Sequence, residues 1–238
     1  PRKNAGFDGR AYALALTSIR LLDGLGVWEH VASNAQPMLE IKVTDGRAGD
    51  GPSPMFMHFD HAEIEEGPMG HMVEDRFLRR ALLDLVKASP NITQINQQLV
   101  IDQATDHTGV TLTLDTGKTL RARLAVGADG RGTGTGARAG IKRIAWEYGQ
   151  TALVCAIEHE LPHHGIAHQF FMPPGPLAIL PLTGNRSSIV WSETTQNAAA
   201  IHALPDVAYL DVLRPRFGGF MGDISLAGGR YTYPLSLS

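Results

Sequence analysis

The chain has 238 residues, enough for one large or two small domains with a full hydrophobic core. Hydrophobic residues make up 43% and charged residues 19%, as in ordinary globular proteins, and the net charge of −3 gives no electrostatic basis for binding nucleic acid. No apolar run approaches the length of about 18 residues that a membrane-spanning helix needs. The single cysteine, Cys155, excludes an intramolecular disulfide, and its apolar neighbours predict a buried strand residue.

The first part of the chain predicts two helices and a pair of strands. Apolar residues at helical spacing predict a helix over 11–25. Alternation predicts strands over 38–45 and 55–59, separated by a Gly- and Pro-rich turn over 46–54. The clearest helix covers 74–88, where the apolar side chains form one stripe.

The second part predicts a sheet and its covering helices. Residues 91–120 are typical of strand pairs joined by hairpin turns, and an apolar run after them predicts a strand that ends at Asp129. Four later strands would complete the sheet that begins at Met38, and two short helices would cover it. These strands are predicted over 146–158, 169–172, 178–182 and 188–193, and the helices over 196–202 and 206–217.

The junction after the apolar run 124–128 carries the main functional signal. The run is typical of a strand buried on both faces, and it ends at Asp129 and Gly130. An acidic side chain there, beside flexible backbone, can accept a ribose hydroxyl or orient a phosphate-bearing cofactor. Asp-Gly is also an ordinary turn pair, so both interpretations stay open. A G-x-G-x-x-A match over 134–139 is weak, because the predicted strand ends several residues before it.

Several segments carry a resemblance to a known family. Residues 127–133 resemble the Asp-Gly motif of flavin-dependent aromatic hydroxylases. Further segments are similar to the ubiquinone-biosynthesis branch, the 2-polyprenyl-6-methoxyphenol hydroxylase-like enzymes, and the likeness covers essentially the whole chain in order. These segments are Asp8-Gly9-Arg10-Ala11, Trp146–Ala152, His159–His163, Gly175–Leu182 and Asn185–Trp191.

The resemblance implies a fold, cofactors and a substrate. The fold would be mixed α/β, as in p-hydroxybenzoate hydroxylase, with a Rossmann-like FAD-binding portion over 1–37 and 67–145 and a mixed β-sheet substrate domain over 38–66 and 146–238. The activity would be hydroxylation of a prenylated phenol in ubiquinone biosynthesis, with FAD, NAD(P)H and O2. Such a protein would be cytoplasmic, and the resemblance is compatible with peripheral membrane association and with a multi-enzyme ubiquinone-biosynthesis complex.

The resemblance also implies site residues, although it assigns no catalytic side chain. Arg10 would contact the flavin cofactor; the alternative is that Arg10 is simply a solvated surface charge. Asp75 would also contact the cofactor; the alternative is that its charge only complements the dipole at the N-terminus of a helix. The motif departs from the family at two points: Thr133 replaces a serine, and Gly136 stands where the family has an arginine. The expected cofactor contacts are Arg10, Asp75, Val100, Asp129, Gly130 and Thr133, and the expected substrate contacts are Tyr148, Leu177, Leu180 and Pro181.

The family places a glycine-rich dinucleotide turn before Pro1 and a second flavin motif after Ser238. We therefore expect an internal fragment that binds flavin weakly or not at all and is inactive alone. Two alternatives stay open. One is a flavin reductase or halogenase of the same fold, and the other is a non-catalytic subunit that binds a partner or a lipid, which Gly136 favours.

Four histidines between the predicted strands invite a metal-site interpretation. No cysteine accompanies them and the H-E-x-x-H spacing is absent, so we expect no metal and exposed loop side chains. The four are His159, His163, His164 and His168.

Overall fold

The computed structural model describes residues 7–64, 66–130 and 134–237. The chain divides into two compact units, which are described separately. The first unit comprises Pro1–Ala88 and Tyr148–Leu235, and the second comprises Ser89–Glu147 with the last three residues.

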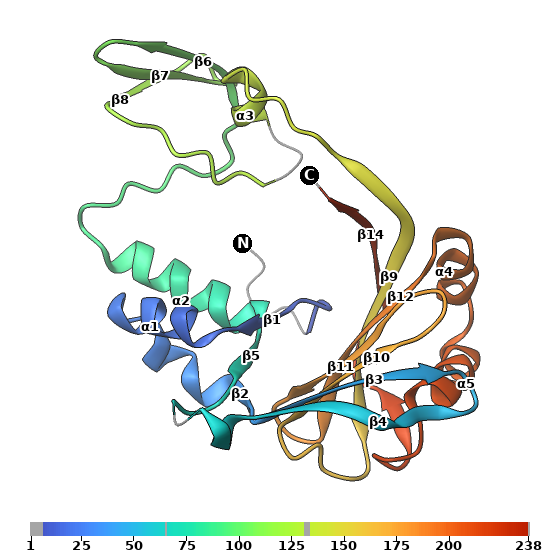
Figure 1. The fold of residues 1–238 in the computed structure, drawn as a ribbon. Helices are drawn as coiled ribbons and strands as arrows, with labels where there is room; N and C mark the ends of the chain where they lie inside the picture. Colours follow the sequence, from blue (N-terminus) through green and yellow to red (C-terminus); the bar gives the residue numbers. More distant parts are fainter. Residues whose placement is uncertain (1–6, 65, 131–133, 238) are drawn as a thin grey trace. The chain divides into compact units, whose positions relative to one another are not determined.

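A large mixed sheet forms the centre of the first unit (Figure 1). Its strand order is β13-β9-β12-β11-β10-β3-β4, with β14 also paired to β9, and only the β10–β3 pair is parallel among the printed registers. The predicted sheet is confirmed, but its first strand begins at Glu40 and not at Met38, because Met38 ends the strand Ala35–Met38 of a separate, smaller sheet. The bounds are β3 (Glu40–Arg47), β4 (Gly51–Asp60), β9 (Trp146–His159), β10 (Ile166–Phe171), β11 (Leu177–Leu182), β12 (Arg186–Thr194), β13 (Ile224–Leu226) and β14 (Tyr231–Leu237).

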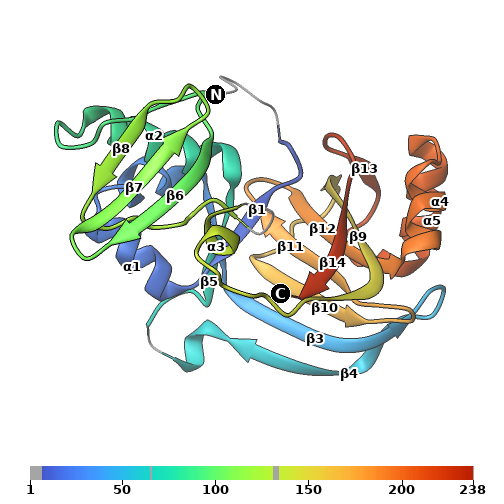
Figure 2. The same cartoon turned by 90° about the horizontal axis from the view of Figure 1, so that it is seen from above.

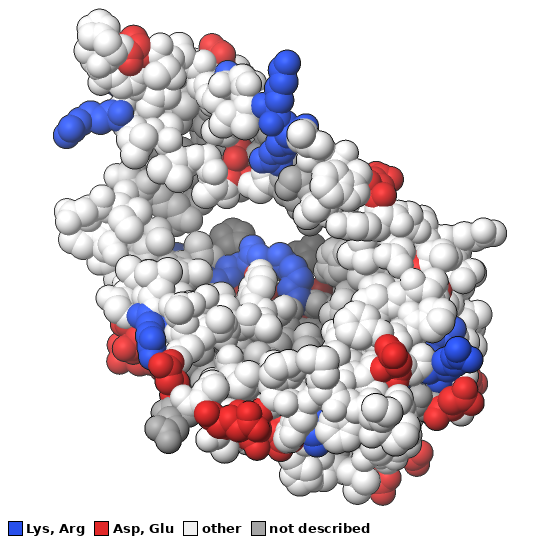
Figure 3. All heavy atoms as spheres, in the orientation of Figure 1, with Lys and Arg blue, Asp and Glu red and all other residues white. Residues whose placement is uncertain are grey.

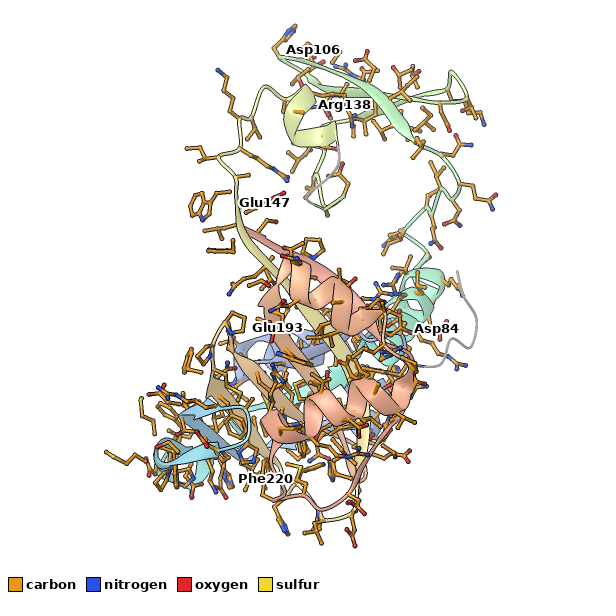
Figure 4. The ribbon with its side chains drawn as sticks, turned by 90° about the vertical axis from the view of Figure 1, so that its right-hand side faces the viewer. Asp84, Asp106, Arg138, Glu147, Glu193 and Phe220 are labelled. Atoms are coloured by element: carbon orange, nitrogen blue, oxygen red, sulfur yellow. The ribbon has the colours of Figure 1, made fainter. Side chains whose placement is uncertain are left out.

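Helices α4 (Thr195–His202) and α5 (Asp206–Phe217) cover one face of this sheet, here called the α4/α5 face (Figure 4). Side chains from alternate strand positions interdigitate with the helices and form the largest hydrophobic core. The predicted helix 206–217 is confirmed at both ends, because the apolar residues that it buries recur at helical spacing. The buried residues of α5 are Tyr209, Leu210, Leu213 and Phe217.

A smaller sheet packs on the second face of the large sheet. It consists of β1 (Ala11–Leu14), β5 (Gly70–Glu74) and β2 (Ala35–Met38), in the order β1-β5-β2. Met38 and Met72 from this sheet contact Ala156, Ala167 and Leu182 of the large one. Helices α1 (Leu16–Gly24) and α2 (Asp75–Ala88) pack with the small sheet in a second hydrophobic cluster, together with the 3-10 helix Trp28–His30. Two further 3-10 helices cover Ala32–Asn34, just before β2, and His61–Glu63, just after β4.

Three boundaries in the first unit differ from the predicted ones. The predicted helix 11–25 begins only at Leu16, because residues 11–14 pair with β5 and tertiary strand pairing overrides local helical spacing. The predicted turn 46–54 is shorter, because β3 and β4 extend into it. Helix α2 begins at Asp75, since Glu74 still belongs to β5.

In its described residues, the second unit contains a three-stranded antiparallel sheet and one short helix (Figure 2). The strands are β6 (Val100–Asp106), β7 (Gly109–Leu114) and β8 (Thr119–Ala122), and the helix is α3 (Gly134–Arg138). The predicted hairpin turn at 106–109 is confirmed, with Asp106 accepting a 2.7 Å hydrogen bond from the Thr108 N–H. Residues 91–99 lie in a loop and bend region rather than in a strand, which corrects that part of the prediction.

The predicted strand that ends at Asp129 is wrong in this structure. Residues 124–129 adopt no strand, and Leu124 and Val126 are 76% and 81% exposed. A strand buried on both faces needs a neighbour on at least one side to take its backbone hydrogen bonds. Within the described ranges, no strand pairs with this run, so its apolar side chains alone do not create the strand.

Candidate functional site

Arg10 and Asp75, predicted from distant parts of the sequence, meet at the end of the small sheet. The Arg10 carbonyl oxygen accepts a 2.9 Å hydrogen bond from the Asp75 N–H, which places the two side chains side by side. Nη2 of Arg10 lies 3.2 Å from Oδ2 of Asp75, and the same guanidinium group binds the carboxylate of Asp8. The Arg10 side chain is 42% exposed. Two carboxylates therefore hold this cation at the surface of the first unit.

Asp75 is the centre of a larger polar cluster. Arg79, one helical turn further along α2, donates to Asp75 from Nε at 2.9 Å, and the Tyr12 hydroxyl donates at 2.5 Å. Burial alone would raise the pKa of Asp75, but the hydrogen bonds from Arg79 and Tyr12 and the charge of Arg10 outweigh it and lower the pKa. Asp75 is therefore a buried, ionised anchor for Arg10.

The preceding residue, Glu74, connects this cluster to the large sheet. Its buried carboxylate lies 2.7 Å from Nε of Arg76 and 2.9 Å from Nη2 of Arg186. Arg186 begins β12, so the ion pair joins the end of β5 to a central strand of the large sheet. The two consecutive acidic residues thus have separate partners: Asp75 pairs with Arg10 and Arg79, and Glu74 pairs with Arg76 and Arg186.

Sequence reasoning missed the partners that hold Arg10 and Asp75 in place. Asp8, two residues before Arg10, belongs to one of the segments that carry the family resemblance, but the resemblance implies no role for it. Arg79 stands four residues after Asp75 in the clearest predicted helix, a spacing that favours an ion pair. No comparable sequence signal connects Tyr12 to Asp75, because their contact depends on the pairing of β1 with β5.

The remaining predicted cofactor contacts belong to the second unit. Asp129 accepts a 2.5 Å hydrogen bond from the hydroxyl of Thr135, and Gly130 has a positive φ of 86°, which favours glycine. Val100 begins β6. Thr133 lies outside the described residues. The structure thus brings Arg10 and Asp75 together, and the role of each residue as a cofactor contact stays a prediction.

The predicted substrate contacts divide between two surroundings. Leu177 is fully buried in the core beneath α4 and α5. Pro181, also buried, shares its strand face by alternation. Leu180 points to the second face, where it packs against the hydrophobic cluster that joins the large sheet to the small one. Tyr148, near the start of β9, is exposed. Their role in substrate binding stays a prediction.

Two of the four histidines, His159 and His163, are buried, and His168 lies half-buried in β10, so the expectation of exposed loop side chains is wrong for all but His164. His159 lies 3.0 Å from the Ser187 hydroxyl and 2.7 Å from the Leu161 carbonyl oxygen. His163 lies 2.8 Å from the Leu182 carbonyl oxygen and accepts from the Gly165 N–H at 2.9 Å. These contacts fix both rings to the backbone. Among the described residues, no group of three or more His, Cys, Asp or Glu side chains is placed to hold a metal ion.

Cys155 is buried in β9, as predicted, and burial raises the pKa of its thiol to about 11.

On the face of the molecule shown in Figure 3, Lys and Arg side chains occur in small separate groups among acidic and uncharged residues. Within the described ranges, no helix is both long and apolar enough to cross a membrane.

Comparison with known sequences assigns the chain to a family. The family described as "FAD binding domain" matches residues 2–200. The protein named "Ubiquinone hydroxylase UbiL" of Rhodospirillum rubrum is 44% identical over 233 residues, which are 98% of this chain and 53% of the relative. The "3-demethoxyubiquinol 3-hydroxylase" of Escherichia coli is 32% identical over 189 residues, 79% of this chain and 46% of the relative. The chain thus spans about half the length of these curated relatives.

Solved structures with the same fold include flavoproteins. PqsL, described as a probable FAD-dependent monooxygenase from Pseudomonas aeruginosa, matches with a TM-score of 0.73 and 18% identity, covering 90% of this chain and 59% of that one. The flavin-dependent monooxygenase PieE, solved with FAD and substrate, matches with a TM-score of 0.71 and 18% identity, covering 95% of this chain and 43% of that one.

The fold is therefore the mixed α/β fold of FAD-dependent monooxygenases, as predicted. The chain belongs to the FAD-binding domain family, and the predicted resemblance to the ubiquinone-biosynthesis hydroxylases is confirmed at the level of sequence.

Proposed function

We propose that this chain forms part of an FAD-dependent monooxygenase that hydroxylates a prenylated phenol in ubiquinone biosynthesis, with NAD(P)H as reductant and O2 as the second substrate. The observation that carries the proposal is the 44% identity to a protein named ubiquinone hydroxylase, which extends over 98% of the chain. The shared fold and the Arg10 cluster are consistent with it.

The residues of the Arg10 cluster fit a flavin dinucleotide. Asp8 and Asp75 bind Nε and Nη2 of Arg10, and among the described residues no partner of Nη1 is seen. A guanidinium group fixed on one side and exposed on the other offers directed N–H donors, which suit anionic phosphate or the polar edge of a cofactor. Arg10 would contact the cofactor, and Asp75 would orient Arg10.

Bound FAD, once reduced, supplies the chemistry that activates O2 for insertion into an electron-rich aromatic ring. The chain would position and shield the reactants. The second face of the large sheet presents Ala178, Leu180 and Val190, whose apolar side chains would exclude water from an aromatic substrate. No ionisable side chain of this chain is assigned a proton-transfer step.

The proposal is tested by turnover of the full-length gene product that carries this sequence. We expect prenylated-phenol-dependent oxidation of NAD(P)H and incorporation of one oxygen atom from 18O-labelled O2 into the phenol, measured by mass spectrometry. Oxidation of NAD(P)H with no oxygenated product would identify a flavin reductase instead. Failure to bind flavin would contradict the proposal and favour a non-catalytic subunit.

A further inference from the structure

The segment that carries Arg10 turns at Gly9. The φ angle of Gly9 is 81°, in the left-handed region that favours glycine. Across this turn, Oδ1 of Asp8 accepts a 3.3 Å hydrogen bond from the Arg10 N–H, and Oδ2 accepts one at 3.1 Å from Nε of Arg10. The direction in which the Arg10 side chain leaves the backbone therefore depends on the conformation of Gly9.

The aromatic ring of Tyr231 covers this turn. A Cβ atom added at Gly9 would lie 2.9 Å from Cγ and from Cε2 of the ring, closer than carbon atoms pack, so the ring is in direct contact with the Gly9 backbone. The Tyr231 hydroxyl group donates a 3.4 Å hydrogen bond to the carbonyl oxygen of Phe7. Tyr231 thus contacts the backbone on both sides of Asp8.

Tyr231 belongs to a different sheet from the one that begins after Arg10. Arg10 directly precedes β1 of the small sheet, and its carbonyl oxygen accepts from the N–H of Asp75, which follows β5. Tyr231 begins β14, which pairs with β9 of the large sheet. All of these residues belong to the first unit. The turn at Gly9 is therefore held between the two sheets, and Tyr231 supplies the contact from the large one.

The next residue on the same face of β14 also lies near the Arg10 cluster. Tyr233 stands two positions after Tyr231, so alternation places both side chains on one face of the strand. Burial is the main cause that raises the pKa of Tyr233, and the charges of Arg10 and Asp8 also act on it. The face of β14 that carries Tyr231 is therefore directed towards Arg10 and Asp8.

We propose that Tyr231 is a positioning residue for Arg10: its ring fixes the turn at Gly9, and the fixed turn directs the exposed side of the Arg10 guanidinium group to the flavin cofactor. The proposal rests on the proposed function, in which Arg10 contacts FAD. Glycine has more backbone freedom than any other residue, so an uncovered turn at Gly9 would present Arg10 in several directions. Ordering the turn before FAD binds removes this entropic cost from binding.

The expected effect of Tyr231 on FAD affinity is smaller than that of Arg10 itself. Asp8 and Asp75 bind the guanidinium group directly, and both carboxylates remain when the Tyr231 ring is removed. Tyr231→Ala therefore frees the turn but keeps the cation. We expect FAD binding to weaken about fivefold, as for the ordering of about one backbone residue.

The test is FAD titration of variants of the full-length gene product, followed by flavin fluorescence. Tyr231→Phe keeps the ring over Gly9 and loses only the 3.4 Å hydrogen bond to Phe7, so it should retain most of the affinity that Tyr231→Ala loses. Thr232→Ala is the matched control. Thr232 is exposed and lies on the opposite face of β14, so this variant should bind FAD as the wild type does.

A double-mutant cycle with Arg10→Gln separates positioning of Arg10 from general packing. If Tyr231 acts through Arg10, Tyr231→Ala should not weaken FAD binding further in the Arg10→Gln background. Additive losses in the double variant, or wild-type affinity in folded Tyr231→Ala, would overturn the proposal. Thermal unfolding without FAD checks that each variant is folded, and Tyr231→Leu takes the place of Tyr231→Ala in the cycle if the alanine variant is unfolded.

Turnover distinguishes failure of this proposal from failure of the proposed function. Additive losses together with hydroxylation of the prenylated phenol by the wild type would reject the role of Tyr231 and leave the proposed function standing. A wild-type protein that binds no FAD would contradict both.

Discussion

Among single residues, Asp75 combines burial with three side-chain partners, two of which are arginines. The carboxylate is exposed over only 7% of its side-chain surface, and Arg10, Arg79 and Tyr12 surround it. Hydrogen bonds to a buried charge contribute about 1.5–3 kcal/mol each when one partner is removed. Asp75 therefore serves the stability of the first unit as well as the placement of Arg10.

Asp75→Asn should destabilise the protein at pH 7 by about 1–3 kcal/mol, because a neutral amide cannot pair with three donors and offers two of its own. The pKa of Asp75 is lowered on folding, so its ionisation stabilises the fold above the unfolded pKa of about 3.9 and this contribution is lost as the pH falls through the folded value. Urea unfolding should show the gap between wild type and variant narrowing below about pH 4.

The control for that measurement is Asp84→Asn on the same helix. Asp84 forms only exposed ion pairs with Arg80 and Lys87, which contribute little. We expect a change within about 0.5 kcal/mol. A loss of stability in Asp84→Asn as large as that in Asp75→Asn would contradict the expectation, because it would show that the effect does not depend on the buried partners of Asp75.

His168 gives a second pH dependence of stability, which arises from a buried neutral base rather than from a paired carboxylate. Its ring packs 4.7 Å from the ring of Phe220, and burial, followed by the charge of Lys42, lowers its pKa to about 4. The unfolded chain binds the proton more readily, so His168 should reduce stability as the pH falls from about 6.5 towards 4. In His168→Phe, this part of the pH dependence should be absent. Identical profiles for the two proteins between pH 7 and 4 would refute the expectation.

Among elements, helix α5 is the clearest case in which local pattern and tertiary packing agree. Its buried residues fall on one stripe, and Figure 4 shows α4 and α5 lying over the strands of the large sheet. Glu193, labelled in the same view, pairs with Arg216 of α5 at 3.5 Å. The helix is therefore held both by apolar side chains and by an ion pair to β12.

Leu213→Ala should destabilise the protein by about 2–5 kcal/mol, because Leu213 is fully buried between α5 and the sheet and its truncation leaves a cavity. Val207→Ala in the same helix, at a position that is 72% exposed, should change stability by less than about 0.5 kcal/mol. Thermal and urea unfolding measure both changes. Comparable losses in the two variants would mean that α5 is stabilised by helix propensity rather than by its buried stripe.

The sequence predicts elements well where one local pattern decides the structure. Strands β3, β4 and β9 to β12 of the large sheet follow from alternation, and α2 and α5 follow from helical spacing, whereas the short strands β13 and β14 are not among the predicted elements. Residues 11–14 are misassigned because their pairing with β5, more than fifty residues away, outweighs a helical pattern. Residues 124–128 are misassigned because an apolar run forms a strand only where neighbouring strands accept it. Contacts such as Tyr12 with Asp75 depend on the same long-range pairing.

For the whole molecule, the family assignment and the fold agree with the sequence prediction. The proposed contact between Arg10 and the flavin cofactor depends on the first unit. There the small sheet, the Arg10 cluster and the second face of the large sheet belong to one compact body. Arg10 and Asp75 were predicted separately and are in contact in that body. The roles of Val100, Asp129 and Gly130 concern the second unit and remain predictions.

The central claim is that Arg10 contacts a flavin cofactor, and FAD titration of the full-length gene product tests it most directly. We predict saturable binding that Arg10→Gln weakens about tenfold or more, in line with the loss of a charge-assisted hydrogen bond. Arg80→Gln, which removes an exposed arginine from α2, should leave the affinity unchanged. Thermal unfolding without FAD checks that both variants are folded. Equal FAD affinity in wild type and a folded Arg10→Gln variant would contradict the account.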